Sequence, residues 1–402
     1  MTQAFANVKI IDFSQVFAGP FATMQLALLG ADVIKIEEPV LGDQCRGIGA
    51  DNDIGRAGMP PFFLAMNANK RSMTLDLKHP GAKEVIARLV KDADVVVQNF
   101  RPGVIDRLGF GYEAMKAIKP NLIYCSVSGY GQTGPSSAAP AYDGAIQATS
   151  GMMSVTGYPE NGPTRVGFTV VDLGTAVMAA FAIAGALYRR ATTGEGQHLD
   201  VSMLDTSLAL MSPLVSTFLN TGVAPALVGN GSVVKLPTTG SFETKGGGGI
   251  LLSAMTDKQW AGITRAIERP DLLADSRFAS VDGRRDHYEL IRPELMTAFA
   301  TNTAEYWEKR LNGEGVPGSA IRTIPEVLEH EQVAHREVIG RISGAAGVDR
   351  EIGLVTSGFS AGPDGPAIAS PPPGKGEHTD AILREAGYTV AEIATLRDSG
   401  AL

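Results

Sequence analysis

Hydrophobic and polar positions alternate in blocks along the first part of the chain. Short runs of β-branched and other apolar residues are followed by longer stretches in which apolar residues recur at helical spacing. The short runs predict strands over residues 8–13, 31–37, 71–76, 95–99 and 121–126. The longer stretches predict helices over residues 21–29, 80–90 and 112–118. Strands that alternate with helices in this way favour βαβ units, and therefore a doubly wound, Rossmann-like α/β fold.

The pattern changes after this first region. A loop rich in glycine and proline is expected over residues 129–144, and an alanine-rich helix over 175–190. A strand over 199–203 and a helix over 204–219 follow. Residues 221–240 then mix glycine, proline and valine without a helical period, which indicates a domain boundary.

The remaining residues predict a smaller α+β domain and a return to the large domain. A hairpin is expected over residues 240–255, turning at Gly246–Gly249. Helices are expected over residues 258–267, 287–300, 303–312, 379–385 and 389–399. We therefore expect a large domain over residues 1–220, completed by residues 330–402, and a small domain over residues 221–329.

Composition narrows the class of protein. The chain has 402 residues, of which 44% are hydrophobic and 19% charged, values typical of a globular protein with more than one domain. The net charge is −8, whereas general nucleic-acid binders are more often basic, so we expect no nucleic-acid partner. The two cysteines, Cys45 and Cys125, belong to no CxxC motif or Cys/His cluster, so we expect neither a disulfide scaffold nor a bound metal.

The N-terminal residues lack the charged and apolar segments of a signal peptide. The longest apolar run, over residues 176–188, contains 13 residues. A helix that crosses a bilayer needs about 20 apolar residues, so this run favours a buried helix instead. We therefore expect a cytoplasmic protein without a membrane partner.

Several common active-site signatures are missing from the sequence. The turn after the first strand, residues 14–20, contains no GxGxxG, so a dinucleotide cofactor is not expected. Gly246–Gly249 resembles a phosphate loop but lacks the following Lys-Ser or Lys-Thr, which favours a hairpin turn. The six histidines form no HExxH or HxH pair, and no GxSxG motif is present. Serine and zinc hydrolysis therefore have little support.

Asp172 is the strongest candidate among the carboxylates. It stands just before the predicted alanine-rich helix, where aspartate is a favoured N-cap residue. A carboxylate at a helix start is expected to stay ionised, because the helix dipole and the unpaired amides favour its charge. An ionised carboxylate can also attack an acyl carbonyl and form a covalent intermediate. The sequence thus leaves two compatible roles open for Asp172, helix cap and nucleophile.

A set of short motifs gives the chain a family resemblance. Each motif is weak alone, but their order and spacing together are specific. The motifs are Asp12-Phe13, Ala18–Pro20, Leu29–Glu37, Asn69–Ser72, Leu75–Lys78, Asn99–Gly103, Asp106–Gly109, Tyr142-Asp143, Gln147, Ser150-Gly151, Asp172, Gly194–Gln197, Gly229-Asn230 and Gly376–Thr379. In these residues the chain resembles the class III CoA-transferases, of the formyl-CoA transferase and carnitine/bile-acid-inducible type.

The resemblance implies an activity and a set of site residues. Asp172 matches the family's nucleophile, which carries coenzyme A as an aspartyl-CoA thioester between a donor acyl-CoA and an acceptor carboxylic acid. Coenzyme A is thus a substrate, and no permanently bound cofactor is implied. Lys78, Arg101 and Arg107 are suited to its phosphates, and Leu75 and Phe100 to its adenine. Leu75 and Phe100 could simply be core residues, and Arg107 could equally form a surface salt bridge. The further implied coenzyme or substrate contacts are Gln15, Phe17, Ala18, Asp76, Leu77, Asn99, Tyr142 and Asp143.

Three positions depart from the family pattern. Phe17 stands where formyl-CoA transferase has a glutamine beside the reacting carbonyl, so Gln15 becomes the candidate amide for stabilising an oxyanion. Glu38 stands where family members often have arginine, and Arg46 is the candidate replacement for a phosphate contact. The family's glycine loop is matched by Gly229–Ser232 rather than by Gly246–Gly249.

The same superfamily includes α-methylacyl-CoA racemases, which need two proton-transferring groups on opposite sides of a carbon. Their Gly-His-Asp motif is replaced here by Ala141-Tyr142-Asp143, and tyrosine is a poor substitute because of its high pKa. The resemblance therefore favours CoA transfer over racemisation. A CoA-binding protein without turnover is the third hypothesis, and the presence of Asp172 speaks against it. The family fold implies an interlocked homodimer.

Overall fold

The computed structural model describes residues 3–49 and 53–402, which fall into two compact units. The first unit combines the chain up to Ser150 with Gly167–Val215 and Glu331–Leu402. The second unit combines Gly151–Val166 with Ser216–His330. The domain boundaries at 220/221 and 329/330 remain predictions. Contacts also assign residues 151–166 to the second unit, a segment that the hydrophobic pattern does not distinguish.

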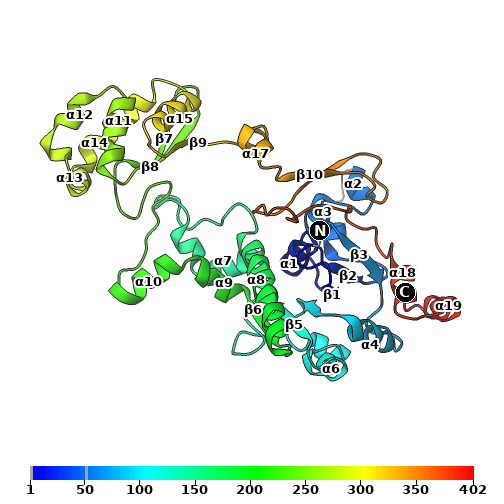
Figure 1. Ribbon diagram of the computed structural model, residues 1–402. Coiled ribbons are helices and arrows are strands. Elements are labelled where there is room, and N and C mark those ends of the chain that lie inside the picture. The colour runs from blue at the N-terminus through cyan, green and yellow to red at the C-terminus, as the bar shows by residue number, and fades with distance from the viewer. Residues whose placement is uncertain (1–2, 50–52) are drawn as a thin grey trace. The chain divides into compact units, whose positions relative to one another are not determined.

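The first unit is built on a six-stranded sheet whose neighbouring strands are all parallel. The strands are β1 (Lys9–Asp12), β2 (Asp32–Glu37), β3 (Lys70–Thr74), β4 (Val95–Gln98), β5 (Ile123–Ser128) and β6 (His198–Ser202). Their order is β3-β2-β1-β4-β5-β6 (Figure 1), the order of a Rossmann-like doubly wound sheet. The predicted fold class is thus confirmed.

Successive residues along each strand point to opposite faces of the sheet. Ile10, Val95 and Val97 pack in one buried cluster with α1 (Ala18–Ala27) and α8 (Val170–Thr193). Ile11 and Val96 belong to a second buried cluster on the opposite face. The helices of that face are α4 (Ala82–Asp92), α5 (Val104–Leu108), α6 (Tyr112–Ile118), α18 (Thr379–Glu385) and α19 (Val390–Asp398). Because both faces are covered, the strands read as continuous apolar runs.

Two helices begin earlier than the pattern predicts. α1 begins at Ala18 rather than at residue 21, because Pro20 fits into a first helical turn, where its missing N–H is not needed. α8 begins at Val170 and contains 24 residues. The predicted helix over 204–219 is instead two helices, α9 (Met203–Leu210) and α10 (Ser212–Thr221), with Pro213 at the start of the second.

The 13-residue apolar run at residues 176–188 is therefore only the middle of α8. By length and composition alone α8 could cross a membrane, since an 18-residue stretch of it has a mean hydropathy of 2.0. One face of the helix, including Ala176, Ala179 and Ile183, is buried against the sheet. Core helices of soluble proteins pass the same test, so α8 is weak support for a membrane span.

The second unit contains an antiparallel sheet with helices packed against it. Its strands are β7 (Thr239–Glu243), β8 (Gly249–Ser253) and β9 (Gly318–Ala320). Glu243 pairs with Gly249, which confirms the predicted hairpin and its turn. The helices are α11 (Asp257–Ala266), α12 (Pro270–Ala274), η3 (Ser276–Phe278), α13 (Val281–Asp286), α14 (Tyr288–Phe299), α15 (Ala304–Gly313) and α16 (Ile324–Leu328). Trp260, Phe299 and Trp307 lie in the core of this unit.

Some short elements are not predicted by the pattern. In the first unit these include the antiparallel pair β10 (Ile339–Ile342) and β11 (Ile352–Val355), which packs in a cluster with α3 (Pro61–Asn67). Further examples are η1 (Gln44–Gly47), α2 (Asp53–Arg56), α7 (Asp143–Thr149), η2 (Met152–Val155) and α17 (Glu331–His335). Elements of four to seven residues are too short for a helical period to be recognised.

Candidate active site

The carboxyl ends of β1 and β4 meet at the point where the strand order reverses, which is where doubly wound sheets bind ligands. A cavity of about 330 Å³ lies there, within the first unit. It is lined by Gln15, Val16, Phe17, Ala18, Gln44, Asn99, Phe100, Arg101, Pro102, Val104, Val127, Ser128, Gly129, Ser137, Ala139, Ala141, Tyr142, Asp172 and Met203. The segments after β1, β4 and β5 thus build one cavity together with the start of α8.

The structure brings most of the predicted site residues together. Eight of them line this cavity: Gln15, Phe17, Ala18, Asn99, Phe100, Arg101, Tyr142 and Asp172. A second cavity of about 310 Å³ is lined by Leu75–Lys78 and shares Gln15 and Phe100 with the first. Arg107 is exposed on α5 and lines neither cavity, and Asp143 is buried beside the start of α8. These placements do not test the roles that the resemblance implies.

Asp172 is not the N-cap of α8, so this alternative from the sequence is wrong. The helix begins at Val170, and Asp172 lies inside its first turn. The capping group is the carboxylate of Asp143, the first residue of α7. Its Oδ2 accepts from the backbone N–H of Val171 at 2.8 Å and of Asp172 at 3.1 Å. The carboxylate of Asp143 therefore takes the amides that would otherwise stabilise the charge of Asp172.

This arrangement changes the expected protonation of Asp172. Burial, and then the neighbouring charge of Asp143, raise the pKa of Asp172 to about 7. The expectation of a carboxyl that stays ionised because of the helix start is therefore wrong. Asp172 has no ion pair among residues 3–49 and 53–402. Its carboxyl group is thus half-buried, uncompensated and open to the cavity.

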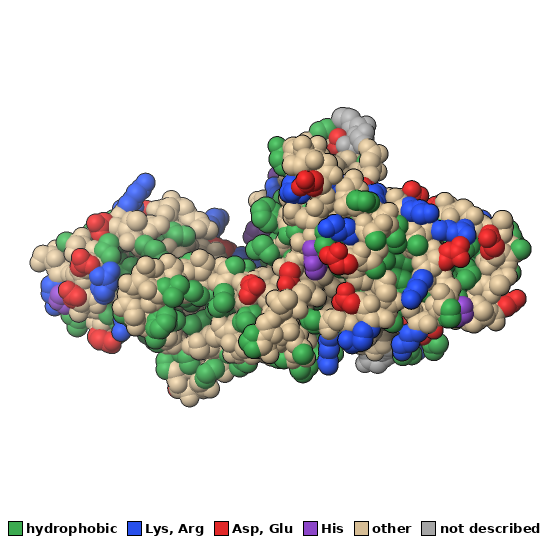
Figure 2. All heavy atoms as spheres, turned by 90° about the horizontal axis from the view of Figure 1, so that it is seen from below, with side chains coloured by type: hydrophobic (Ala, Val, Ile, Leu, Met, Phe, Trp, Pro, Cys, Tyr) green, Lys and Arg blue, Asp and Glu red, His purple; other side chains and the backbone are tan. Residues whose placement is uncertain are grey.

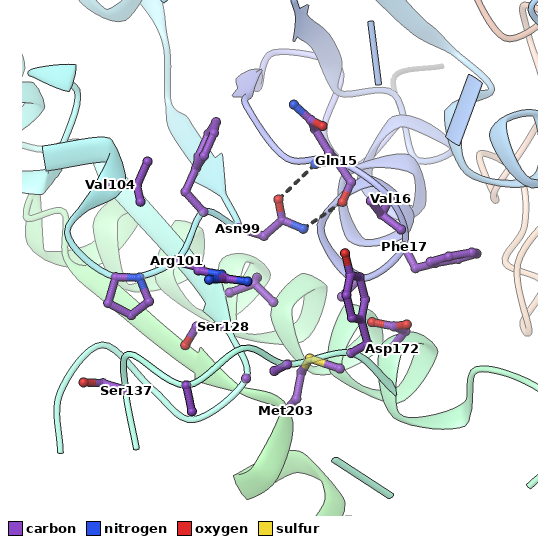
Figure 3. Close-up of a pocket in the computed structure, with 18 of the residues that line it drawn as sticks. Gln15, Val16, Phe17, Asn99, Arg101, Val104, Ser128, Ser137, Asp172 and Met203 are labelled. Carbon is purple, nitrogen blue, oxygen red and sulfur yellow. Dashed lines mark hydrogen bonds between the residues drawn. The ribbon is translucent and has the colours of Figure 1, made fainter. Parts of the chain in front are cut away.

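Arg101 supplies positive charge to the same cavity. In Figure 3 its guanidinium extends toward the side of the cavity on which the carboxyl group of Asp172 lies. The side chain of Arg101 is exposed and has no ion pair in the part of the chain that the structure describes. A free guanidinium of this kind is suited to a carboxylate or a phosphate of a ligand.

The turn between β1 and α1 forms the wall next to Phe17. Asn99 accepts from the backbone N–H of Gln15 at 2.9 Å and donates to its carbonyl oxygen at 2.8 Å (Figure 3). Among the described residues, the backbone N–H groups of Phe17 and Ala18 donate to no protein acceptor. The side-chain amide of Gln15 and these two N–H groups are therefore the candidate donors to an oxyanion.

Arg46 cannot replace the family arginine as a phosphate contact, so that expectation is wrong. Its guanidinium makes a bidentate ion pair with buried Glu37, with Nε to Oε2 at 2.7 Å and Nη2 to Oε1 at 2.8 Å. Two further N–H groups, one on Nη1 and one on Nη2, donate to the carbonyls of Gly58 and Pro373. Only 8% of Arg46 is exposed, because this pairing keeps it inside the fold.

Several cavity residues are not identified by the sequence. Ser128 and Gly129 follow β5, and their place at a strand end is a signal that the topology could have supplied. Val16 also lines the cavity and has a φ of 70°, which is rare for a β-branched residue. No local motif marks Val16, because its conformation depends on side chains that are distant in the sequence.

Comparisons with a family model and with related proteins point to the same family. The model of the family described as CoA-transferase family III matches residues 5–379. The acetyl-CoA:oxalate CoA-transferase of Acetobacter aceti is 37% identical over 341 residues, 85% of this chain and 86% of that protein. The succinyl-CoA:glutarate CoA-transferase of Homo sapiens is 35% identical over 399 residues, 94% of this chain and 85% of that protein.

Solved structures show the same similarity. The crystal structure of a CAIB/BAIF family protein from Brucella suis matches with a TM-score of 0.85 and 30% sequence identity. The match covers 96% of this chain and 100% of that one. Sequence and fold are therefore similar over nearly the whole length.

Proposed function

Because this chain belongs to CoA-transferase family III, we propose that it transfers coenzyme A through a thioester on Asp172. Membership of the family makes it a CoA-transferase that uses acyl-CoA and a carboxylic acid. The observation that carries the assignment of the nucleophile is the carboxyl group of Asp172, which opens onto the cavity at the strand switch point and has no cation partner among the residues that the structure describes. A cytoplasmic location remains a prediction.

The proposed reaction has four steps in which the carboxylate of Asp172 is consumed and regenerated. It attacks the donor thioester carbonyl and expels CoA thiolate, which leaves a mixed anhydride. The thiolate attacks the aspartyl carbonyl, which releases the first acid and leaves an aspartyl-CoA thioester. The acceptor carboxylate then attacks this thioester, expels the thiolate and forms a second anhydride. Attack of the thiolate on the acceptor's acyl carbonyl gives the new acyl-CoA and frees Asp172.

The cavity residues support these steps in two ways. The raised pKa makes the carboxylate of Asp172 a stronger nucleophile than an ordinary aspartate, provided that the pH is high enough to ionise it. Each attack places negative charge on a carbonyl oxygen. The backbone N–H groups of Phe17 and Ala18 are suited to stabilise that charge by donating hydrogen bonds to the oxygen. Gln15 is a further donor on the same wall of the cavity.

We further propose that the acceptor is a dicarboxylic acid. The relatives are named for oxalate, glutarate and mesaconate, which all carry two carboxylates. Arg101 supports this choice, because it lines the cavity of Asp172 and its guanidinium has no ion pair within residues 3–49 and 53–402. One carboxylate of the acid would react at Asp172 while Arg101 binds the other.

A homodimer also remains a proposal. The outer face of α8 exposes large apolar side chains, with Val177 57%, Phe181 73% and Tyr188 75% exposed. Hydrophobic side chains also lie among charged ones on the face in view in Figure 2. A second copy of the chain would cover such a surface. Light scattering on the purified protein measures this directly, and a monomeric mass would contradict it.

The test of the proposed function is the covalent intermediate. Incubation with acyl-CoA should increase the mass of the protein by that of CoA less one water, and hydroxylamine should release the CoA because it cleaves thioesters. Asp172→Ala should abolish the adduct, whereas exposed Asp205→Ala should retain it. If the α-hydrogen of the acyl group exchanges with deuterium and no adduct forms, the chain acts as a racemase. If neither occurs, it is a binding protein.

A further inference from the structure

Side chains bind every backbone polar group of the turn formed by residues 14–16. Asp12 accepts from Ser14 N–H at 2.9 Å, and Lys35 Nζ donates to Ser14 O at 2.8 Å. Asn99 holds both backbone groups of Gln15. Backbone groups in a turn are usually bound by other backbone groups or by water. A turn held only by side chains is therefore fixed by the surrounding fold rather than by its own geometry.

Val16 is the strained residue of this turn. Its φ of 70° lies in the left-handed region, which a β-branched residue rarely adopts. Asp43 Oδ1 accepts from Val16 N–H at 3.0 Å, and the thiol of Cys45 donates to Val16 O at 3.5 Å. Strain of this kind persists only where the surroundings impose it, and it gathers at functional sites.

Asp43 connects this strained residue to a buried layer of charges. Its Oδ2 forms an ion pair with Lys35 Nζ at 2.6 Å, and neither side chain is exposed. Its Oδ1 also accepts from Cys45 N–H at 2.9 Å, so the carboxylate is bound on both oxygens. Burial raises the pKa of the Cys45 thiol to about 12, which keeps it protonated and able to donate. Asp43 and its partners are thus locked in one arrangement.

The residues that follow Val16 are those that face Asp172. Phe17 and Ala18 line the cavity with Asp172, and their N–H groups have no acceptor among the described residues. The direction of the chain at Val16 decides where these two residues lie. A misplacement of about 1 Å at a reacting centre can cost a factor of about 100 in rate.

We propose that Asp43 is a positioning residue for the reaction at Asp172, because it holds Val16 in the left-handed conformation and so fixes Phe17 and Ala18 in the cavity wall. Asp43 itself lines neither cavity, so it acts through Val16. This inference rests on the proposed transferase function. It adds a role for a charged layer that the reaction itself does not use.

The first experiment replaces Asp43 by asparagine in two backgrounds. Asp43→Asn should lower kcat for CoA transfer by about 10- to 100-fold, while KM for acyl-CoA changes by less than about threefold. Glycine adopts a positive φ without strain, so in a Val16→Gly background the same replacement should cost at least about fivefold less. Equal losses in both backgrounds would overturn the proposal. So would a loss that only follows the folded fraction measured by thermal unfolding.

A second pair of variants applies if Asp43→Asn does not fold. Cys45→Ala removes the donor to Val16 O, whereas Cys45→Ser keeps one. We expect kcat to fall by about 2- to 10-fold for Cys45→Ala and by less for Cys45→Ser. The same kcat in both variants would contradict the anchored turn. The mass adduct on the wild-type chain is measured first, so that failure of the proposed function is recognised separately.

Discussion

Two groups of acids lie close to the same cavity, one buried and one half-buried, and they differ in the charges that surround them. In the buried group, Asp12 pairs with Lys70 at 3.1 Å and Asp43 with Lys35 at 2.6 Å. Despite burial, these cations and nearby hydrogen bonds hold the pKa of Asp12 below its usual value. Asp172 instead has a second carboxylate, Asp143, as its charged neighbour, and its pKa is raised.

The presence or absence of a neighbouring cation distinguishes carboxylates that stabilise the fold from one that can react. A compensated carboxylate is stable as an anion and holds neighbouring groups in place. A carboxylate without a neighbouring cation costs free energy to ionise. When it forms a bond to a substrate carbonyl carbon, its negative charge passes to the substrate and that free energy is recovered. The two groups therefore predict different responses to substitution, which allow the distinction to be tested.

The largest effect is expected at Asp172. Asp172→Asn keeps the shape of the side chain but removes the nucleophile, so kcat for CoA transfer should fall by about four orders of magnitude or more. Exposed Asp205 occupies the first turn of α9 and lies outside the cavity, so Asp205→Asn serves as the matched control with unchanged kcat. Substantial turnover by Asp172→Asn would show that another group carries the acyl transfer.

Breaking the compensated group should act on stability instead. Lys70→Met leaves Asp12 without its nearest cation, which should lower the free energy of unfolding by about 3–5 kcal/mol. Urea denaturation measures this change. Lys91→Met, at an exposed position of α4, should change it by less than about 0.5 kcal/mol. An equally small effect of Lys70→Met would mean that the buried pair is not required for the fold.

The third prediction concerns Arg101, the positively charged residue that lines the cavity of Asp172. If it binds the second carboxylate of the acceptor, Arg101→Gln should lower kcat/KM for dicarboxylates by about 10- to 100-fold and leave monocarboxylates little changed. If it binds a phosphate of CoA instead, KM for every acyl-CoA should rise alike. Lys91→Gln is the comparison variant, because Lys91 is exposed on α4 and lines neither cavity.

The smallest effect concerns the pH dependence. Asp172 must be ionised to react, so kcat/KM should fall as the pH decreases through about 7. Asp143→Asn can still accept from the start of α8 but removes the neighbouring negative charge, so the pKa of Asp172 should fall. The acidic limb of the pH profile should then move to lower pH by about half a pH unit or more. An unmoved limb would assign the titration to another group.

The sequence predicts the sheet better than the site. Parallel strands buried on both faces leave continuous apolar runs, so β1 to β6 are recognisable from local pattern alone. The hydrogen bond between Asp143 and Val171 at the start of α8 joins residues that are 28 positions apart in the sequence. The hydrogen bond between Asp43 and Val16 joins residues that are 27 positions apart. No local pattern reports such contacts. The same limit applies to Arg46, because only the fold shows its pairing with Glu37.

The most direct test follows oxygen atoms into Asp172. Turnover with an acceptor acid labelled with oxygen-18 in its carboxylate should leave one labelled oxygen on Asp172, because the bridging oxygen of the second anhydride stays with the aspartate. Trypsin should release residues 166–189, in which Asp172 is the sole acidic residue, so mass spectrometry of that peptide locates the label. We expect this peptide to gain one oxygen-18 in the first turnover, and a second when the other carboxylate oxygen attacks in a later one. An unlabelled peptide after many turnovers would contradict nucleophilic catalysis by Asp172.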